Sequence, residues 1–327
     1  MARGDAGGVS LPGKVQITTG ARLHIGPLAN AAETGRDFGG VGLMVSAPSC
    51  RVVVSTSESD TITAPDAIYD RVAKVRDQCR TSDAWKPCQI EVVESIPQHH
   101  GFGGGTQLSL AIATAMARLN QDDSNTFKLA RRVGRGLRSG LGIHGFEYGG
   151  FLVDGGKSMP NSIGGLSARN NFPDEWTLLL ISPGGSEGLS GEREVQAFRD
   201  LSPMSITDTS HLCRLVLMRM LPAISEQDFC EFADAVGEFG QRVGEYFSPA
   251  QGGVFSSQRM SDLADQLGRE GIRGVAQTSW GPTIAAFFPT EQEAILKHSE
   301  LTSDEVWADC SIIIATAMNR GAEVVEL

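Results

Sequence analysis

The sequence predicts an α+β fold in which two layered subdomains meet at a cleft. Each half of the chain begins with runs of strand-forming residues and continues with runs at helical spacing. The 327 residues can bury a large core, either in one large domain or in two smaller domains that share a cleft. A glycine-rich loop also joins the end of one strand directly to an amphipathic helix. We place the division between the two parts at residues 1–160 and 161–327.

The N-terminal part contains most of the strand signals. Strands are expected at residues 14–18, 41–45, 51–55, 89–96 and 151–153, which alternate or are β-branched. A helix is expected over residues 66–79. The strongest helical pattern follows the glycine loop, with apolar residues at Leu108, Ile112, Met116 and Leu119. A shorter helix is expected over 126–133.

The C-terminal part is more helical. Ser225 and Asp228 have the spacing of a capping box before an aromatic stripe that we interpret as core packing. Thr290 and Glu293 show the same spacing before a second helix. Strands are expected at residues 176–181, 274–279, 283–288 and 311–315.

Composition excludes several classes of function. The net charge of -11 argues against a general nucleic-acid-binding or anionic membrane surface. No apolar run reaches the roughly 20 residues of a membrane span, and the polar first 13 residues do not resemble a signal peptide. The six cysteines form no C-x-x-C pair, and the histidines form no zinc motif. We therefore expect a cytoplasmic protein that binds neither nucleic acid nor membrane and has no intrinsic zinc.

The glycine-rich loop predicts an anion site. Four glycines crowd the turn between the strand and the helix, and Thr106 and Gln107 follow them. The glycines are Gly101, Gly103, Gly104 and Gly105. A helix N-terminus offers unpaired N–H groups and a partial positive charge, and glycines allow phosphate oxygens to approach closely. The alternative is a tight turn without a ligand, but four glycines exceed what a turn requires.

Two further segments contain candidate site residues. Arg22 stands among small and apolar residues, where a guanidinium needs an anionic partner, although a lone arginine on a strand is often a surface residue. His24 could equally be a ligand contact or a core histidine. Glycines also frame Arg138, Ser139 and His144 in the one dense basic segment of the chain, residues 131–150, and a ligand contact is the favoured interpretation there. Arg131 and Arg132 are expected at a solvated helix end, and either Glu147 or Asp154 could supply a carboxylate.

At these segments the sequence resembles a known family. The stretches at residues 21–26 and 97–107 and the late glycine turn at 278–282 are similar to the GHMP kinase superfamily. Within it, residues 36–44, 103–108 and 134–156 most closely resemble the β-ribofuranosylaminobenzene 5'-phosphate synthase family of methanopterin biosynthesis. The resemblance spans nearly the whole chain and is stronger over residues 15–156. It implies a GHMP-kinase-like architecture with a phosphate loop at a helix N-terminus.

The resemblance also implies a reaction. Phosphoribosyl pyrophosphate would condense with 4-hydroxybenzoate or 4-aminobenzoate and release carbon dioxide and pyrophosphate, with Mg²⁺ as the cofactor. By analogy, Arg22 and the loop 101–106 would hold phosphates, and Arg138 to His144 would hold the arene or its carboxylate. Archaeal-type members carry an acidic residue soon after the first stretch, whereas this chain has Ala29 and Asn30. A homodimer is expected from the general frequency of such assemblies.

Two other functions remain open. An ATP-dependent small-molecule kinase of the same superfamily usually has two serines in this loop, where this chain has Gly104 and Gly105. Such a kinase would lose an Mg²⁺ ligand here. A non-catalytic sensor of a phosphorylated metabolite would retain the fold without the chemistry, but the loop and the basic segment are both intact.

Overall fold

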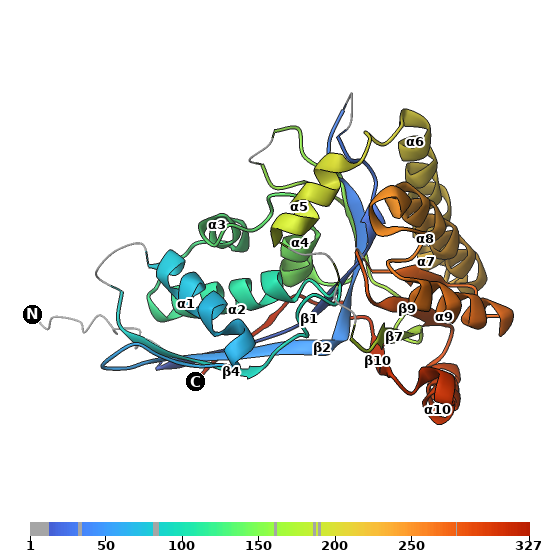
Figure 1. Ribbon diagram of the computed structural model, residues 1–327. Helices are drawn as coiled ribbons and strands as arrows, with labels where there is room; N and C mark the ends of the chain where they lie inside the picture. Colours follow the sequence, from blue (N-terminus) through green and yellow to red (C-terminus); the bar gives the residue numbers. More distant parts are fainter. Residues whose placement is uncertain are drawn as a thin grey trace, which may run out of the picture.

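The computed structural model describes residues 13–31, 35–80, 85–159, 162–185, 188, 191–278 and 280–327. The first of its two sheets has the strand order β11-β1-β2-β4-β3, and β5 pairs with both β2 and β6. These strands are β1 (Lys14–Pro27), β2 (Gly40–Thr56), β3 (Thr61–Thr63), β4 (Cys88–Glu94), β5 (Phe151–Asp154), β6 (Leu166–Asn170) and β11 (Glu323–Glu326). Figure 1 shows β1 and β2 as long bent strands that run through the middle of the molecule.

The long strands follow from continuous strand-forming sequence. The segments expected at 41–45 and 51–55 are one strand, β2, which pairs antiparallel with β1 over most of its length. The register shifts between Gly20 and Ala21, so residues 46–48 of β2 bulge out of the ladder. Both strands are buried over most of their length because layers cover both faces.

Four helices lie to one side of these strands (Figure 1): α1 (Asp66–Cys79), α2 (Gly104–Leu119), α3 (Thr126–Arg132) and α4 (Leu141–Tyr148). Helices α1, α2 and α3 confirm the expected ranges. Helix α2 buries twelve residues, many of them alanines, because small side chains allow it to approach β1 and β2 closely. Helix α4 was not expected; six of its eight residues are buried, and two of these are glycines, which have weak helical propensity.

The second sheet has the order β10-β7-β9-β8. Its strands are β7 (Thr177–Pro183), β8 (Val275–Gln277), β9 (Ile284–Phe288) and β10 (Cys310–Thr316). Strand β7 is buried on both faces: Leu178 and Leu180 face the main core, whereas Leu179 and Ile181 face a second apolar cluster. The second cluster is covered by α9 (Gln258–Arg269), α10 (Glu291–Ser303) and the 3-10 helix η2 (Glu305–Trp307).

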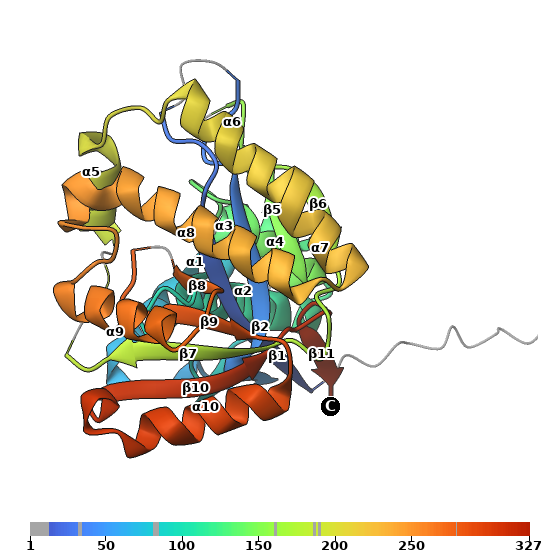
Figure 2. The ribbon, with the colours of Figure 1, turned by 90° about the vertical axis from the view of Figure 1, so that its right-hand side faces the viewer.

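The remaining helices come between β7 and α9 in the chain, and the longest of them packs against the second sheet (Figure 2). They are α5 (Gly191–Asp200), α6 (Ile206–Leu215), the π-helix η1 (Val216–Met220), α7 (Leu221–Glu226) and α8 (Phe229–Gln251). The predicted capping box at Ser225 is wrong: Asp228 is the N-cap of α8, and its carboxylate accepts from the Glu231 backbone N–H. The aromatic stripe of α8 is buried, as expected for core packing. The cap at Thr290 is confirmed, with its hydroxyl accepting from the Glu293 N–H.

The layers do not follow the predicted division of the chain at residue 160. Strand β6 lies after this point yet pairs with β5, and the C-terminal strand β11 returns to pair with β1. One apolar core also contains residues from Val15 to Ala315. Residues 160 and 161 lie outside the described part of the chain, as do residues 1–12, so the boundary stays a prediction.

Within the described residues, the structure contains no helix that is both long and apolar enough to cross a membrane.

Candidate active site

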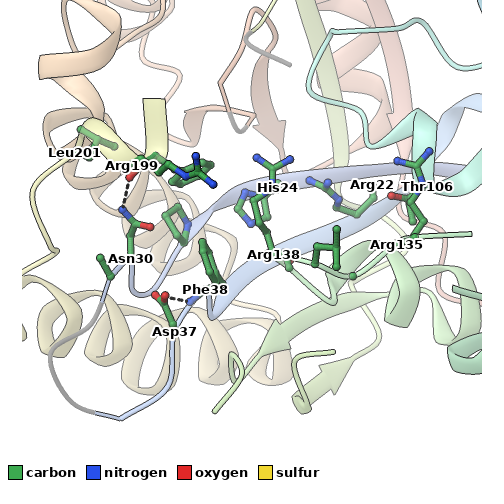
Figure 3. A pocket seen from close by; sticks show the side chains of 17 residues that line it. Arg22, His24, Asn30, Asp37, Phe38, Thr106, Arg135, Arg138, Arg199 and Leu201 are labelled. Atoms are coloured by element: carbon green, nitrogen blue, oxygen red, sulfur yellow. Dashed lines mark hydrogen bonds between the residues drawn. The ribbon is translucent and has the colours of Figure 1, made fainter. Parts of the chain in front are cut away.

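A cavity of about 760 Å³ opens beside the end of β1. Its walls come from four places: β1 with the loop that follows it, the first turn of α2, the loop before α4, and the end of α5. The lining residues are Arg22, His24, Pro27, Asn30, Ala31, Asp37, Phe38, Thr106, Gly134, Arg135, Gly136, Leu137, Arg138, Ser139, Phe198, Arg199 and Leu201. Figure 3 shows His24 and Arg138 in the middle, Arg22, Thr106 and Arg135 at one end, and Phe38, Arg199 and Leu201 at the other.

The glycine-rich loop is fastened to β1 beside Arg22. The Arg22 backbone N–H donates to the Phe102 carbonyl at 2.9 Å, and the Phe102 ring is buried. Gly103 is the N-cap of α2 with a φ of 65°, in the left-handed region that favours glycine. A Cβ on Gly103 would lie 3.1 Å from Arg22 Nε. Loop and guanidinium therefore pack in direct contact at the start of α2.

The second sheet holds the other side of the same loop. Gly101 has a φ of 79°, and a Cβ there would lie 2.2 Å from Thr278 Oγ1. The Thr283 hydroxyl donates to the His100 carbonyl at 2.7 Å. The late glycine turn thus contacts the phosphate-type loop, although Ser279 within that turn lies outside the described residues. This contact fixes the loop from both layers of the fold.

A buried carboxylate positions the basic loop before α4. Asp154 accepts from the Gly140 N–H at 2.6 Å and from the Gly156 N–H at 2.9 Å. The Ser139 hydroxyl donates to it at 3.4 Å and accepts from the Leu141 N–H. Burial raises the pKa of the Asp154 carboxyl, and the two backbone donors oppose that shift. Of the two carboxylates suggested by the sequence, Asp154 anchors the loop, whereas Glu147 is exposed on α4.

The cavity wall is strongly cationic in an acidic protein. Four arginines line it, namely Arg22, Arg135, Arg138 and Arg199, and Asp37 is the one carboxylate among the lining residues that the structure describes. His24 lies between the cations. Burial and the charges of Arg22 and Arg138 hold the pKa of its imidazole well below the usual 6.5. His24 is therefore neutral at pH 7, and the arginines carry the positive charge of the site.

The depressed pKa of His24 predicts a pH dependence of stability. The unfolded chain binds this proton below about pH 6.5 while the folded protein does not, so stability is fully present above that pH and falls on acidification. Between pH 7 and 5.5 the wild type should lose about 1 kcal/mol more unfolding free energy than His24→Gln. Urea titrations of both proteins at a series of pH values would measure the difference. Parallel curves would show that His24 protonates normally in the folded state.

One end of the cavity is aromatic. Phe38 has a φ of 61°, an uncommon conformation for a non-glycine residue, and its ring packs edge-on against Phe198 at 6.3 Å. Backbone strain of this kind persists only where neighbours hold it. The Arg36 guanidinium donates to the carbonyls of Gly155 and Gly156. The backbones of Asp37 and Lys157 pair in an isolated antiparallel β-bridge. The Arg138 guanidinium lies 5.8 Å above the Phe198 ring, which joins the aromatic end to the cationic wall.

The structure brings five of the predicted site residues to the cavity: Arg22, His24, Thr106, Arg138 and Ser139. Gln107 and His144 do not line it. Gln107 is fully buried, accepts from the Thr19 hydroxyl and donates to the Gly142 carbonyl. The His144 Nε2 atom is 2.8 Å from the Gly164 carbonyl, and the ring packs against Phe127. Both side chains therefore connect elements of the fold behind the cavity wall.

The four loop glycines lie behind Thr106 at the start of α2 and are likewise absent from the lining. Gly104 packs against Ile96, where a Cβ would lie 3.0 Å from that side chain. Gly105 faces two arginines, Arg71 and Arg135. The glycines thus allow close packing of the loop, and their contact with a phosphate stays a prediction.

Several lining residues were not predicted. Arg135 and the pair Asp37 and Phe38 lie inside stretches that carried the family resemblance, so the sequence contained a signal for them. Phe198 and Arg199 lie on α5, and no local pattern connects that helix to the glycine loop. Asn30 is buried. Its side-chain amide donates to the Tyr246 hydroxyl at 2.8 Å, and its backbone carbonyl accepts from the Met204 N–H. A carboxylate could not make the first of these bonds.

The side chains offer little for a metal ion by themselves. Within the described ranges, no group of three or more His, Cys, Asp or Glu residues could hold one. Mg²⁺ at phosphate substrates usually needs only one or two carboxylates, with the phosphate oxygens and water supplying the rest. Asp37 is the one carboxylate among the described lining residues, but it lies beside Phe38 at the end of the cavity away from Arg22 and Thr106, so Mg²⁺ that arrives with a phosphorylated substrate would be held by phosphate oxygens and water.

Known proteins resemble this chain in sequence and in fold. The GHMP kinases N terminal domain family matches residues 67–150. The beta-ribofuranosylphenol 5'-phosphate synthase of Archaeoglobus fulgidus is 32% identical over 95% of this chain and 99% of its own length. The protein of the same name from Methanothermobacter thermautotrophicus is 30% identical, over 95% of this chain and 98% of its own length.

Solved structures agree on the fold. Mevalonate diphosphate decarboxylase from Staphylococcus aureus superposes with a TM-score of 0.67 at 14% identity, covering 97% of this chain and 99% of that one. Homoserine kinase from Cytophaga hutchinsonii superposes with a TM-score of 0.62 at 13% identity, covering 97% and 98%. Identity this low establishes the architecture alone. The sequence relatives extend over nearly the whole chain, and the chain therefore belongs to the beta-ribofuranosylphenol 5'-phosphate synthase family, on a GHMP kinase fold.

Proposed function

We propose that this chain condenses phosphoribosyl pyrophosphate with a 4-substituted benzoate and releases carbon dioxide and pyrophosphate. The C1–O bond to pyrophosphate breaks, a bond forms between ribose C1 and the ring carbon that bears the carboxylate, and the bond to the carboxylate carbon breaks. The carboxylate leaves as carbon dioxide, and its electron pair restores the aromatic ring. The exchange is balanced without an oxidant or any net proton transfer.

The two-ended cavity is the observation that carries this proposal. The proposed reaction has two substrates: one carries several phosphate charges, and the other is an aromatic ring. The cavity likewise combines a cationic wall beside the glycine loop with an aromatic end at Phe38 and Phe198. A net charge of -11 disfavours anions elsewhere on the surface, so four lining arginines mark this cavity as the place for them.

In this mechanism the cations stabilise the charge that develops on the leaving group. As the C1–O bond lengthens, ribose C1 becomes cationic and the pyrophosphate oxygens gain negative charge. Arg22 lines the cavity beside the start of α2, and we expect it to bind those oxygens together with backbone N–H groups of the glycine loop. Mg²⁺ held by the substrate's phosphates and water would supply further charge neutralisation.

At the other end, the arene packs against Phe38 and Phe198, and Arg138 binds its carboxylate. A guanidinium can hold a carboxylate through two parallel hydrogen bonds, which would direct the substituted ring carbon toward C1. Because no net proton transfer occurs, a general acid is not required at this step. The neutral state of His24, which has no imidazolium proton to donate, is consistent with a step that needs no general acid.

The relatives' name favours a hydroxyl group on the arene. Those proteins are named for a ribofuranosylphenol product, which corresponds to 4-hydroxybenzoate as the substrate. 4-Aminobenzoate has a similar shape and an equally electron-donating substituent. In either case the product would be a C-riboside phosphate of the kind used in methanopterin biosynthesis.

Release of carbon dioxide and pyrophosphate tests the proposal. Purified protein with Mg²⁺, phosphoribosyl pyrophosphate and either benzoate should release both products in equal amounts. Benzoate without a 4-substituent should react at least about 10²-fold more slowly, because it lacks the donor that stabilises the ring cation and each tenfold loss needs only 1.4 kcal/mol. A control with ATP and small alcohols tests the kinase alternative. ATP consumption without carbon dioxide release would replace the synthase function with that of a kinase.

A further inference from the structure

Two arginines converge behind the glycine loop: Arg135, which also lines the cavity, and Arg71, which does not. Arg71 is on α1 and Arg135 precedes α4, and both are partly buried. Their Nη1 atoms lie 2.7 Å and 3.7 Å from the point where a Cβ on Gly105 would stand. Two guanidinium groups therefore face one small space at the start of α2.

The protein partners of this pair are neutral. Arg71 donates to the Gln98 side-chain carbonyl, and the Gln98 amide is itself held by the Ile96 carbonyl. Arg135 donates to the Ser109 hydroxyl at 2.9 Å and 3.2 Å. Across the ranges that the structure describes, neither arginine forms an ion pair with a carboxylate. Burial, and secondly the charge of Arg71, lower the pKa of Arg135 to about 10, so both groups remain charged at neutral pH.

Such an arrangement is unfavourable without a ligand. Two like charges close together and partly removed from water repel each other, and neutral partners hold their positions without compensating their charge. An oxyanion in the space beside Gly105 would compensate both, through charge-assisted hydrogen bonds. A side chain at position 105 would fill that space, and this explains glycine where the superfamily usually has serine.

We propose that Arg71, Arg135 and Gly105 form a subsite for the diphosphate group of the substrate. The identity of that substrate rests on the proposed function. Of the cavity's two ends, this one lies at Thr106 and Arg135, opposite Phe38 and the aromatic wall (Figure 3). Attack on ribose C1 needs the arene and the leaving group on opposite sides of that carbon. The diphosphate belongs at the end away from the aromatic wall, and its larger charge matches a pair of guanidinium groups better than a phosphate monoester does.

Calorimetric titration with inorganic pyrophosphate tests the subsite without any turnover. Arg71→Met and Arg135→Met should each weaken pyrophosphate binding at least tenfold, because each removes one charged donor. Gly105→Ala should weaken it similarly. Alanine favours a helix, and its methyl group displaces only the flexible end of Arg71, so the fold should be kept. Lys74→Met is the matched control, since Lys74 is exposed on the same helix and should have no effect.

Ribose 5-phosphate serves as the second probe. Its binding should change less than threefold in the three variants. Loss of ribose 5-phosphate binding with unchanged pyrophosphate binding would overturn the proposal, because the pair would then hold the 5'-phosphate. Unchanged binding of both ligands would also overturn it. If pyrophosphate binding depends on the pair but no benzoate releases carbon dioxide, the subsite stands and the synthase function fails.

Discussion

Replacing Arg22 with methionine is expected to lower kcat/KM for the condensation by about 10³-fold. Arg22 is on β1, with its backbone fixed to the glycine loop and its guanidinium against Gly103. In the proposed mechanism it binds oxygens whose negative charge grows as the C1–O bond breaks. Loss of one such donor affects the transition state more than the ground state, so kcat should fall more than KM rises. Steady-state rates of pyrophosphate release measure both quantities.

Two comparison variants make the result for Arg22 specific. Arg131→Met removes a positive charge from an exposed position at the end of α3 and should leave kcat/KM within about twofold, because distant exposed charges are screened. Arg22→Lys keeps the charge without the planar fork and should recover only part of the rate. A rate for Arg22→Met close to that of Arg131→Met would remove Arg22 from the mechanism.

Local sequence signals predicted the elements that carry the site. The glycine loop, the start of α2 and the position of Arg22 on a strand each follow from a pattern within their own short stretch of sequence. These patterns act through backbone geometry: glycine allows a positive φ, and apolar spacing buries one face of a helix. Such effects do not depend on which distant segment packs nearby, so they could be predicted from the sequence.

The opposite wall of the cavity could not be predicted in this way. Phe198 and Arg199 reach the cavity because α5 crosses it, and this depends on how α8 and the loop at Asn30 pack together. His144 is a second case. Its glycine-rich surroundings predicted a ligand contact, but it does not line the cavity, and its imidazole lies within hydrogen-bond distance of the Gly164 carbonyl. A polar residue between glycines has the same local pattern whether it faces a ligand or a buried carbonyl.

The site also depends on two polar groups that are distant in the sequence, Asp154 and His24. Asp154 is a buried carboxylate, yet it anchors the backbone of the loop that carries Arg138. His24 lies beside two guanidinium groups and remains neutral, so the wall does not gain a further positive charge. A neutral imidazole can accept or donate a hydrogen bond without adding repulsion against Arg22 and Arg138. Asp154 and His24 thus shape the cationic wall in different ways, one by anchoring its backbone and the other by staying neutral.

Arg138→Met should weaken binding of 4-hydroxybenzoate by about 10²-fold, because a guanidinium–carboxylate bond in a partly dry site contributes about 1.5–3 kcal/mol. Phenol lacks the carboxylate and should bind the wild type and the variant equally weakly. Comparing the two ligands isolates the guanidinium–carboxylate interaction. Affinity should fall in the variant only for the ligand that carries the carboxylate. Calorimetric titration of both proteins with each ligand, without phosphoribosyl pyrophosphate, gives the dissociation constants. An equal loss for phenol and for 4-hydroxybenzoate would mean that Arg138 acts by supporting the Phe198 ring, 5.8 Å away, and that the carboxylate binds elsewhere along the wall.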